Sequence, residues 1–197
     1  MTDSTWLVVG LGNIDEQYQK TRHNVGVMAI RHLAESFNEK FSRHKKTNSF
    51  LAQAKEGSQK ILMAYLDCYM NESGGPTQSL MQFFNVSEEH LVILHDELDL
   101  DFENLRIKFA GGDNGHNGLK SIRAAIGNGE FHRVRLGIGR PKTQQDPASF
   151  VLEKFSQSES SKLEEFLAES TSAIQTLMRD GLSQAQNLYH KRVDQNE

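Results

Sequence analysis

The 197-residue sequence predicts one α/β domain, a sandwich in which helices flank a central mixed, mostly parallel β-sheet. Short apolar runs typical of strands alternate with segments in which apolar residues repeat at helical spacing. Two of the strand-like runs are separated by only four residues, which predicts an antiparallel hairpin within the sheet. We find no internal repeat, low-complexity tract or linker, so residues 1–197 are expected to form a single domain.

Each expected element follows from its pattern of apolar residues. The strands are short apolar runs bounded by glycine or polar residues, and they are expected at 6–11, 49–55, 60–66, 91–95, 105–109 and 132–138. The helices carry apolar residues on one face, and they are expected at 24–41, 76–84, 117–126, 159–179 and 182–191. Pro76 suits the first turn of its helix, and Gly181 separates the last two helices.

Composition excludes several classes of protein. Hydrophobic residues make up 37% of the chain and charged residues 24%, as in a globular domain. The apolar runs are far shorter than the roughly 18 residues needed to cross a bilayer. No basic segment precedes the first strand, so we expect no signal peptide and a cytoplasmic location. Cys68 is the only cysteine, which excludes an intramolecular disulfide and a multi-cysteine metal site.

Charge is unevenly distributed along the chain. The net charge of −4 argues weakly against a nucleic-acid-binding protein. Residues 105–142, however, carry eight lysines and arginines against only Asp113 and Glu130. This basic stretch is compatible with a phosphate-bearing ligand, although a solvated surface is the commoner explanation of such a stretch.

Polar residues follow three of the expected strands. Asn13 follows the first strand, Asn71 follows the strand at 60–66, and Asp96 follows the strand at 91–95. Ligands of open α/β sheets bind beyond the carboxyl ends of the parallel strands. If these strands are parallel neighbours, the three side chains converge on one edge of the sheet.

Two familiar ligand motifs are incomplete. The turn Gly10-Leu11-Gly12 has Asp15 where a dinucleotide-binding loop requires its third glycine. The alternating acids at 99–103 begin like a calcium loop but lack its glycine and its closing glutamate. We therefore expect neither a cofactor nor a metal.

His23 is a candidate general base. It lies near the start of the first long helix, where the helix dipole disfavours the imidazolium form. A lone histidine among eight is more often a capping or surface residue. Asp96 changes this expectation because it can orient one ring nitrogen while the other faces water. Without an adjacent serine or cysteine nucleophile, such a pair indicates activation of water.

The glycine-rich stretch at 111–118, G-G-D-N-G-H-N-G, leads into the helix at 117–126. Its backbone N–H groups suit an anion or a developing oxyanion, and His116 and Asn117 are placed to enter the same site. A flexible connector whose glycines serve turn geometry explains the stretch equally well.

In its motifs, the chain resembles the bacterial-type peptidyl-tRNA hydrolases. The matching segments occur in the same order along nearly the whole chain: V-V-G-L-G-N at 8–13, T-R-H-N-V-G at 21–26, Y-M-N-E-S-G at 69–74, H-D-E-L-D-L at 95–100, G-H-N-G-L-K-S at 115–121, F-H-R-V-R-L-G-I-G at 131–139 and F-V-L-E-K-F at 150–155. Any one segment is weak evidence, but the ordered set is highly specific.

The resemblance implies a metal-free α/β monomer that hydrolyses the ester between a peptide and the terminal ribose of tRNA. His23 matches the catalytic histidine and Asp96 the carboxylate that orients it. Lys108 and Arg135 match basic residues that engage tRNA phosphates near the acceptor end. The resemblance implies no obligate protein partner. Further residues expected to contact the substrate or line the site are Asn13, Tyr18, Met70, Asn71, His116 and Asn117.

The chain departs from the family pattern in two places. Ile14-Asp15 replaces the usual Pro-Gly, so the turn after Asn13 is expected to be looser. Asp113-Asn114 brings a carboxylate into the glycine-rich stretch, where it would weaken phosphate attraction or gate the loop.

Two other functions remain open from the sequence. A non-catalytic RNA-binding module would keep Lys108 and Arg135 and tolerate loss of His23. A general carboxylesterase would need no basic patch and would ignore the tRNA.

Overall fold

The computed structural model describes residues 4–141 and 144–190. Its strands are β1 (Thr5–Gly10), β2 (Ser42–His44), β3 (Ser49–Glu56), β4 (Gln59–Leu66), β5 (Leu91–Glu97), β6 (Leu105–Phe109) and β7 (His132–Gly137). Its α-helices are α1 (Val25–Ser36), α2 (Gly74–Phe84), α3 (Asn117–Ile126), α4 (Pro147–Phe150), α5 (Gln157–Asp180) and α6 (Leu182–Tyr189).

The strands form one mixed sheet in the order β2-β3-β4-β1-β5-β7-β6. The central strands β4, β1, β5 and β7 are parallel to one another. The outer strands β2, β3 and β6 run antiparallel to their neighbours. The predicted fold class is therefore confirmed, with β3 and β4 forming the expected hairpin.

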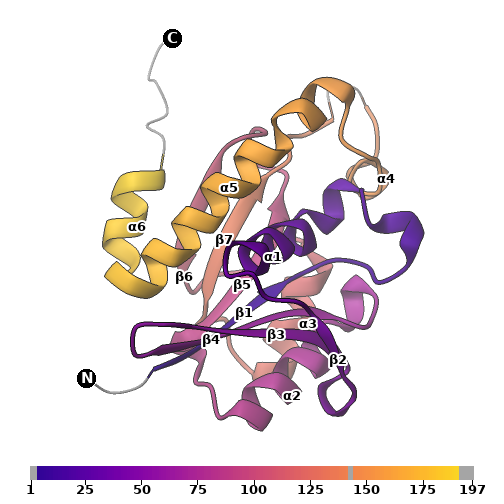
Figure 1. The fold of residues 1–197 in the computed structure, drawn as a ribbon. Helices are drawn as coiled ribbons and strands as arrows, with labels where there is room; N and C mark the ends of the chain where they lie inside the picture. Colours follow the sequence, from indigo (N-terminus) through magenta and orange to yellow (C-terminus); the bar gives the residue numbers. More distant parts are fainter. Residues whose placement is uncertain (1–3, 142–143, 191–197) are drawn as a thin grey trace.

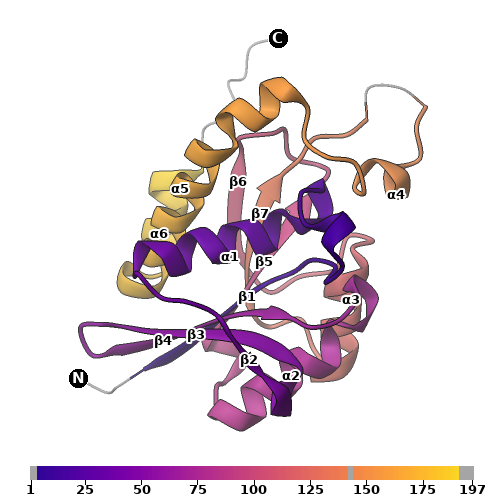
Figure 2. The ribbon, with the colours of Figure 1, turned by 45° about the vertical axis from the view of Figure 1, so that its right-hand side comes forward.

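Helices cover both faces of the sheet (Figures 1 and 2). The larger apolar cluster lies between the sheet and α1, α5 and α6. A second cluster lies on the other face, beneath α2 and α3. Every residue of β5, including its polar end, is buried. Within the described ranges, none of the helices has the length and apolar character of a membrane span.

Helix α1 approaches the sheet backbone to backbone because glycines stand at the contact. A Cβ at Gly26 would collide with the carbonyl oxygen of Leu94 and lie 2.8 Å from the backbone nitrogen of Leu11. A Cβ at Gly10 would in turn collide with the Gly26 carbonyl oxygen. This contact fixes the start of α1, and with it His23, over the carboxyl end of β5.

The element boundaries differ from expectation in several places. Helix α1 ends at Ser36 rather than at residue 41, because the chain turns at Asn38, which adopts a left-handed φ of 56°. The prediction extended too far because Phe41 happens to fit the helical spacing. In the structure it lies beyond the turn and packs on Tyr65, with 4.9 Å between ring centroids. Strand β5 extends to Glu97, while β2 and α4 are too short for a periodic pattern to predict. The expected end of the last helix, Lys191, lies outside the described residues.

Cys68 follows β4 and is buried in the second apolar cluster. Burial, assisted by the nearby carboxylates of Glu72 and Asp67, raises the pKa of its thiol to about 12. The side chain therefore packs as a small hydrophobe and is almost entirely protonated near neutral pH.

Gly26→Ala tests the contact between α1 and the sheet. Replacing an uncrowded helical glycine with alanine stabilises a protein by about 1 kcal/mol. Here the added methyl meets backbone atoms, so we expect destabilisation by about 1–3 kcal/mol. Thermal unfolding of the variant measures the sign of the effect. A melting temperature equal to or above that of the wild type would show that the contact tolerates a side chain.

Candidate active site

A cavity of about 800 Å³ opens at the carboxyl ends of the central strands. Loops after β1, β4 and β5, the segment before α1 and the start of α3 contribute to it. The sequence-predicted residues that line it are Asn13, His23, Met70, Asn71, Asp96, His116 and Asn117. Tyr18 is not among the lining residues; it lies half-buried in the short 3-10 helix Glu16–Tyr18.

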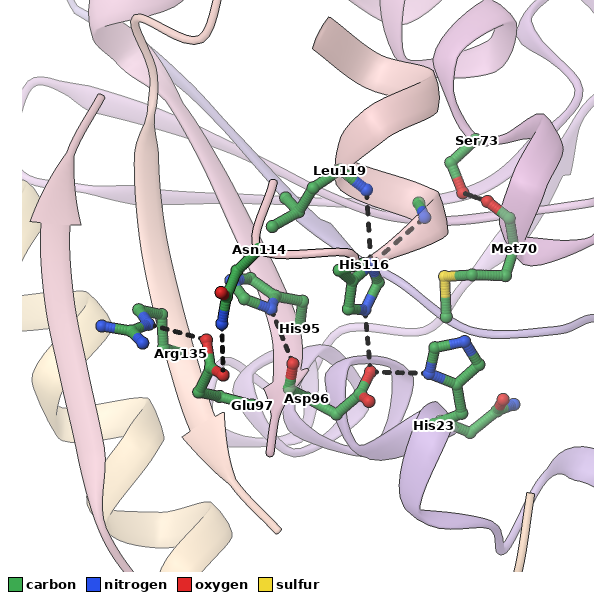
Figure 3. A network of polar contacts seen from close by, with 12 residues as sticks. His23, Met70, Ser73, His95, Asp96, Glu97, Asn114, His116, Leu119 and Arg135 are labelled. Atoms are coloured by element: carbon green, nitrogen blue, oxygen red, sulfur yellow. Dashed lines mark hydrogen bonds and ion pairs between the residues drawn. The ribbon is translucent and has the colours of Figure 1, made fainter. Parts of the chain in front are cut away.

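Two histidines share one carboxylate oxygen at the centre of the cavity (Figure 3). His23 Nδ1 lies 2.8 Å from Asp96 Oδ1, and His116 Nε2 lies 2.9 Å from the same atom. The backbone N–H groups of Gly118 and Leu119 donate to His116 Nδ1, so His116 carries its proton on Nε2. When His23 likewise donates from Nδ1, its Nε2 keeps a lone pair that can accept a proton.

Asp96 is a buried carboxylate that is kept ionised. Burial alone would raise its pKa, but the hydrogen bonds and charges of His23 and His116 hold that pKa well below its ordinary value. The preceding residue, His95, is fully buried and donates from Nδ1 to the Asp96 carbonyl oxygen at 2.8 Å. Burial, assisted by His116, lowers the pKa of His95 to about 3, so His95 is neutral near pH 7.

Asn24 fixes the position of Asn13. Its side chain accepts from the Asn13 backbone N–H and donates to the Asn13 carbonyl oxygen, both at 2.9 Å. The Asn13 side-chain oxygen accepts from the backbone N–H of Met70 at 2.8 Å. That bond sets the orientation of the Asn13 amide and leaves its NH₂ group available to a ligand. Asn24 was not predicted as a site residue, although it follows His23 directly.

Two buried arginines anchor the segments around the site. The Arg133 guanidinium donates to the carbonyl oxygens of Gly111 and Gly112, which fixes the base of the glycine-rich loop. Arg22, next to His23, pairs with Glu159 at 2.6 Å and stacks on the Phe150 ring at 4.4 Å. Each guanidinium therefore binds polar groups, carbonyl oxygens or a carboxylate, and so holds its neighbouring segment in place.

The part of the cavity wall formed by the α4 segment was not predicted. Pro147, Ala148, Val151 and Leu152 of the α4 segment present apolar surface to the cavity, and the Val151 carbonyl accepts from the His23 backbone N–H at 2.8 Å. The sequence signal for this short helix is Asp146 followed by proline, which places an N-cap before a proline at the first turn. The other lining residues that were not predicted are Glu97, Leu98, Asn114, Gly115, Arg140 and Asp146.

The structure places Lys108 and Arg135 outside the cavity, on the face of the sheet that carries His95. In the register of the antiparallel strands β6 and β7, Arg106 lies opposite Arg135 and Lys108 lies opposite Arg133. The four side chains therefore share one face of the sheet. The pKa of Lys108 is lowered, mainly by burial and to a smaller extent by the positive charges of Arg135 and Arg133. Basic side chains are thus concentrated beside the cavity; Lys142, the last of the basic stretch, lies outside the described residues.

At both places where the chain departs from the family pattern, an aspartate side chain accepts a hydrogen bond from another segment. The Tyr69 hydroxyl donates to Asp15 at 2.7 Å and joins the loop after β1 to the loop after β4. Arg123 donates to Asp113 at 2.6 Å. The Asp113 carboxylate is therefore paired with an arginine of the adjoining helix α3, and the turn after Asn13 is held by Asn24 and by Tyr69.

One set of potential metal ligands exists among the described residues. The ligand atoms of His23, Asp96 and His116 all lie within 4.8 Å of one another. Both histidines, however, are already bonded to the same Asp96 oxygen. Hydrogen bonding alone therefore accounts for this cluster.

Comparisons with known proteins point in one direction. Residues 7–197 match the family described as Peptidyl-tRNA hydrolase. The chain is 45% identical to the peptidyl-tRNA hydrolase of Mycobacterium marinum over 184 residues, 93% of this chain and 96% of that protein. It is 45% identical to that of Rhodococcus jostii over 190 residues, 96% and 100% of the two chains. The crystal structure of peptidyl-tRNA hydrolase from Acinetobacter baumannii has a TM-score of 0.88 at 30% identity, over 96% of both chains.

His95 predicts a specific loss of stability in acid. Its folded pKa of about 3 lies below the ordinary value of 6.5, so the unfolded chain takes up the proton first and stability falls as pH drops below 6.5. At pH 5 this loss amounts to about 2 kcal/mol. His95→Asn keeps a donor for the Asp96 carbonyl but does not titrate, so its unfolding free energy should change less between pH 7 and pH 5. Equal changes in both proteins, measured by denaturant unfolding, would contradict this.

Proposed function

Because this chain belongs to the peptidyl-tRNA hydrolase family and hydrolyses the ester bond of peptidyl-tRNA, we propose that His23 is the general base that activates the attacking water. The observation that carries this proposal is the 2.8 Å contact of His23 Nδ1 with Asp96 Oδ1. It orients the imidazole and directs the proton-accepting role to Nε2. Asp96 also stabilises the imidazolium that forms when the water loses its proton.

Asparagine amides are proposed to stabilise the reacting ester. Asn13, Asn71 and Asn117 line the cavity that contains His23, and each amide carries two N–H donors. One well-placed donor to a developing oxyanion contributes about 10²–10³ in rate. Asn13 is the best oriented of the three because Asn24 and the Met70 N–H hold it. Asn71 and Asn117 are more exposed and suit the peptide backbone.

The tRNA half of the substrate is proposed to bind across Lys108 and Arg135. These residues lie on one sheet face beside the cavity, with Arg106 and Arg133 as neighbours. Cationic side chains that contact phosphates position a nucleic acid without reading its sequence. Contacts to both peptide and tRNA would distinguish this enzyme from a general esterase.

We also propose that the enzyme acts as a cytoplasmic monomer without an obligate protein partner or cofactor. His23, Asp96 and the three asparagines proposed for the hydrolytic step all line one cavity, which supports a site complete within a single chain. Peptidyl-tRNA is formed where ribosomes translate, which favours a cytoplasmic location. Sedimentation at micromolar concentration tests the monomer directly.

Release of an N-blocked amino acid from tRNA tests the role of His23. We expect His23→Ala to lower the rate about 10²–10⁴-fold because the base is lost. His32→Ala is the matched control; it removes a histidine of α1 that contacts Thr171 rather than the cavity. Binding of tRNA by the wild type without release would favour an RNA-binding module instead. Equal turnover of a small activated ester would favour a general esterase.

Salt dependence tests the phosphate contacts. Phosphate binding by lysine and arginine displaces counterions, so kcat/KM should fall as salt rises from low to physiological concentration. Lys108→Ala should reduce the slope of log(kcat/KM) against log[salt] by about 1. The comparison is made with the same N-blocked substrate from about 50 to 200 mM salt. A flat response in the wild type would exclude the proposed tRNA contact.

A further inference from the structure

Glu97 is a buried carboxylate that the reaction as described does not use. It ends β5 directly after Asp96, and successive side chains of a strand point to opposite faces. Asp96 therefore faces His23, while Glu97 lies on the face of Arg135 (Figure 3). Only 5% of the Glu97 side chain is exposed, so its charge must be compensated by the groups around it.

The two oxygens of Glu97 contact two different parts of the molecule. Oε2 accepts from Arg135 Nε at 2.9 Å. Oε1 accepts from the side-chain amide of Asn114 and from the backbone N–H of Asp99, both at 3.1 Å. One carboxylate thus joins a proposed phosphate-binding arginine to the glycine-rich loop.

The pair with Glu97 leaves Arg135 able to bind phosphate. Its Nε atom is occupied, but the structure records no bond from its terminal nitrogens to another described residue. A guanidinium has five N–H donors in a fixed plane, so holding Nε sets the direction in which the others point. Glu97 is placed to orient the arginine rather than to neutralise it.

The Asn114 contact holds the loop that carries His116. Asn114 adopts a left-handed φ of 50°, and its amide also donates to Asp99 at 2.9 Å. The loop is fixed at its base by Arg133, and two residues after Asn114 by the bond from His116 to Asp96. Between the Arg133 and His116 attachments, the Asn114–Glu97 hydrogen bond holds the loop a third time. It is the attachment whose carboxylate also binds Arg135.

We propose that Glu97 is a positioning residue for this reaction, which orients Arg135 toward tRNA phosphate and holds the glycine-rich loop at Asn114 with the same carboxylate. Engagement of the tRNA and the arrangement of the catalytic loop are then coupled through one side chain. This inference rests on the proposed roles of Arg135 and His116. It predicts that a change at the loop alters recognition of phosphate.

Two substrates separate this role from simple structural support. The first is an N-acetylaminoacyl ester of intact tRNA, and the second is the same ester on a short 3′-terminal oligonucleotide that lacks the rest of the tRNA. Glu97→Gln keeps the shape but places an NH₂ group either where Arg135 donates or where Asn114 and Asp99 donate, so at least one link is lost. We expect kcat/KM for intact tRNA to fall about tenfold or more relative to the short ester, as for loss of one charge-assisted hydrogen bond.

Asn114→Gly tests the coupling itself. Glycine accepts the left-handed backbone and removes the amide contacts with Glu97 and Asp99. We expect this variant also to reduce the preference for intact tRNA and to flatten the salt dependence toward that of Arg135→Ala. Combining it with Arg135→Ala should then give less than the product of the two single effects. Asp99→Asn is the comparison variant, since the Asp99 side chain is hydrogen-bonded to Asn114 and Arg140 and the structure records no hydrogen bond from it to Arg135.

The outcomes for Glu97 can be separated from those for the proposed general base, His23. Turnover of the short ester by the wild type, lost in His23→Ala, tests the proposed base independently of Glu97. If Glu97→Gln slows both substrates equally with unchanged salt dependence, Glu97 supports only the fold and the inference fails. It also fails if Asn114→Gly keeps the wild-type preference for intact tRNA, or if Asp99→Asn reduces that preference as much as Glu97→Gln.

Discussion

The close contact between α1 and the sheet is the constraint on which the site depends. Where Gly10 and Gly26 meet, no side chain separates the helix backbone from β1 and β5. This proximity brings the residues before the helix within hydrogen-bond reach of the end of β5, so a histidine and a buried aspartate from distant parts of the sequence meet at 2.8 Å. A larger residue at either glycine would separate His23 from Asp96, so the proposed catalytic pair and the packing of the helix share one requirement.

The end of β5 shows how a strand can serve several purposes at once. His95, Asp96 and Glu97 are consecutive and buried, and their side chains alternate between the two faces of the sheet. The aspartate faces the histidines, the glutamate faces the basic residues of β7, and the neutral His95 donates to the backbone between them. Because both carboxylates are buried, each is stable only with its donors in place, and a buried network of this kind favours one arrangement of the site.

The central architecture and seven of the residues that line the cavity, with His23 and Asp96 among them, could be predicted from the sequence. The apolar runs and helical periods gave the elements, and the rule that ligands bind at strand carboxyl ends brought Asn13, Asn71 and Asp96 together. Apart from the His23–Asp96 pair, the contacts between segments remote in sequence could not be predicted. The α4 wall, the anchoring by Arg22 and Arg133, and the hydrogen bonds of Asn24 depend on tertiary positions that no local period encodes. The end of α1 was misplaced because Phe41 joins the core from beyond a turn.

The buried Cys68 thiol makes the protein convenient for site-specific labelling. With its pKa raised to about 12, the native thiol has almost no thiolate to attack a maleimide at neutral pH. A cysteine introduced on the surface would therefore be the only reactive one, without any need to replace Cys68 first. A fluorophore attached on the exposed side of α3, near the glycine-rich loop, would then mark a single known position in an otherwise native chain.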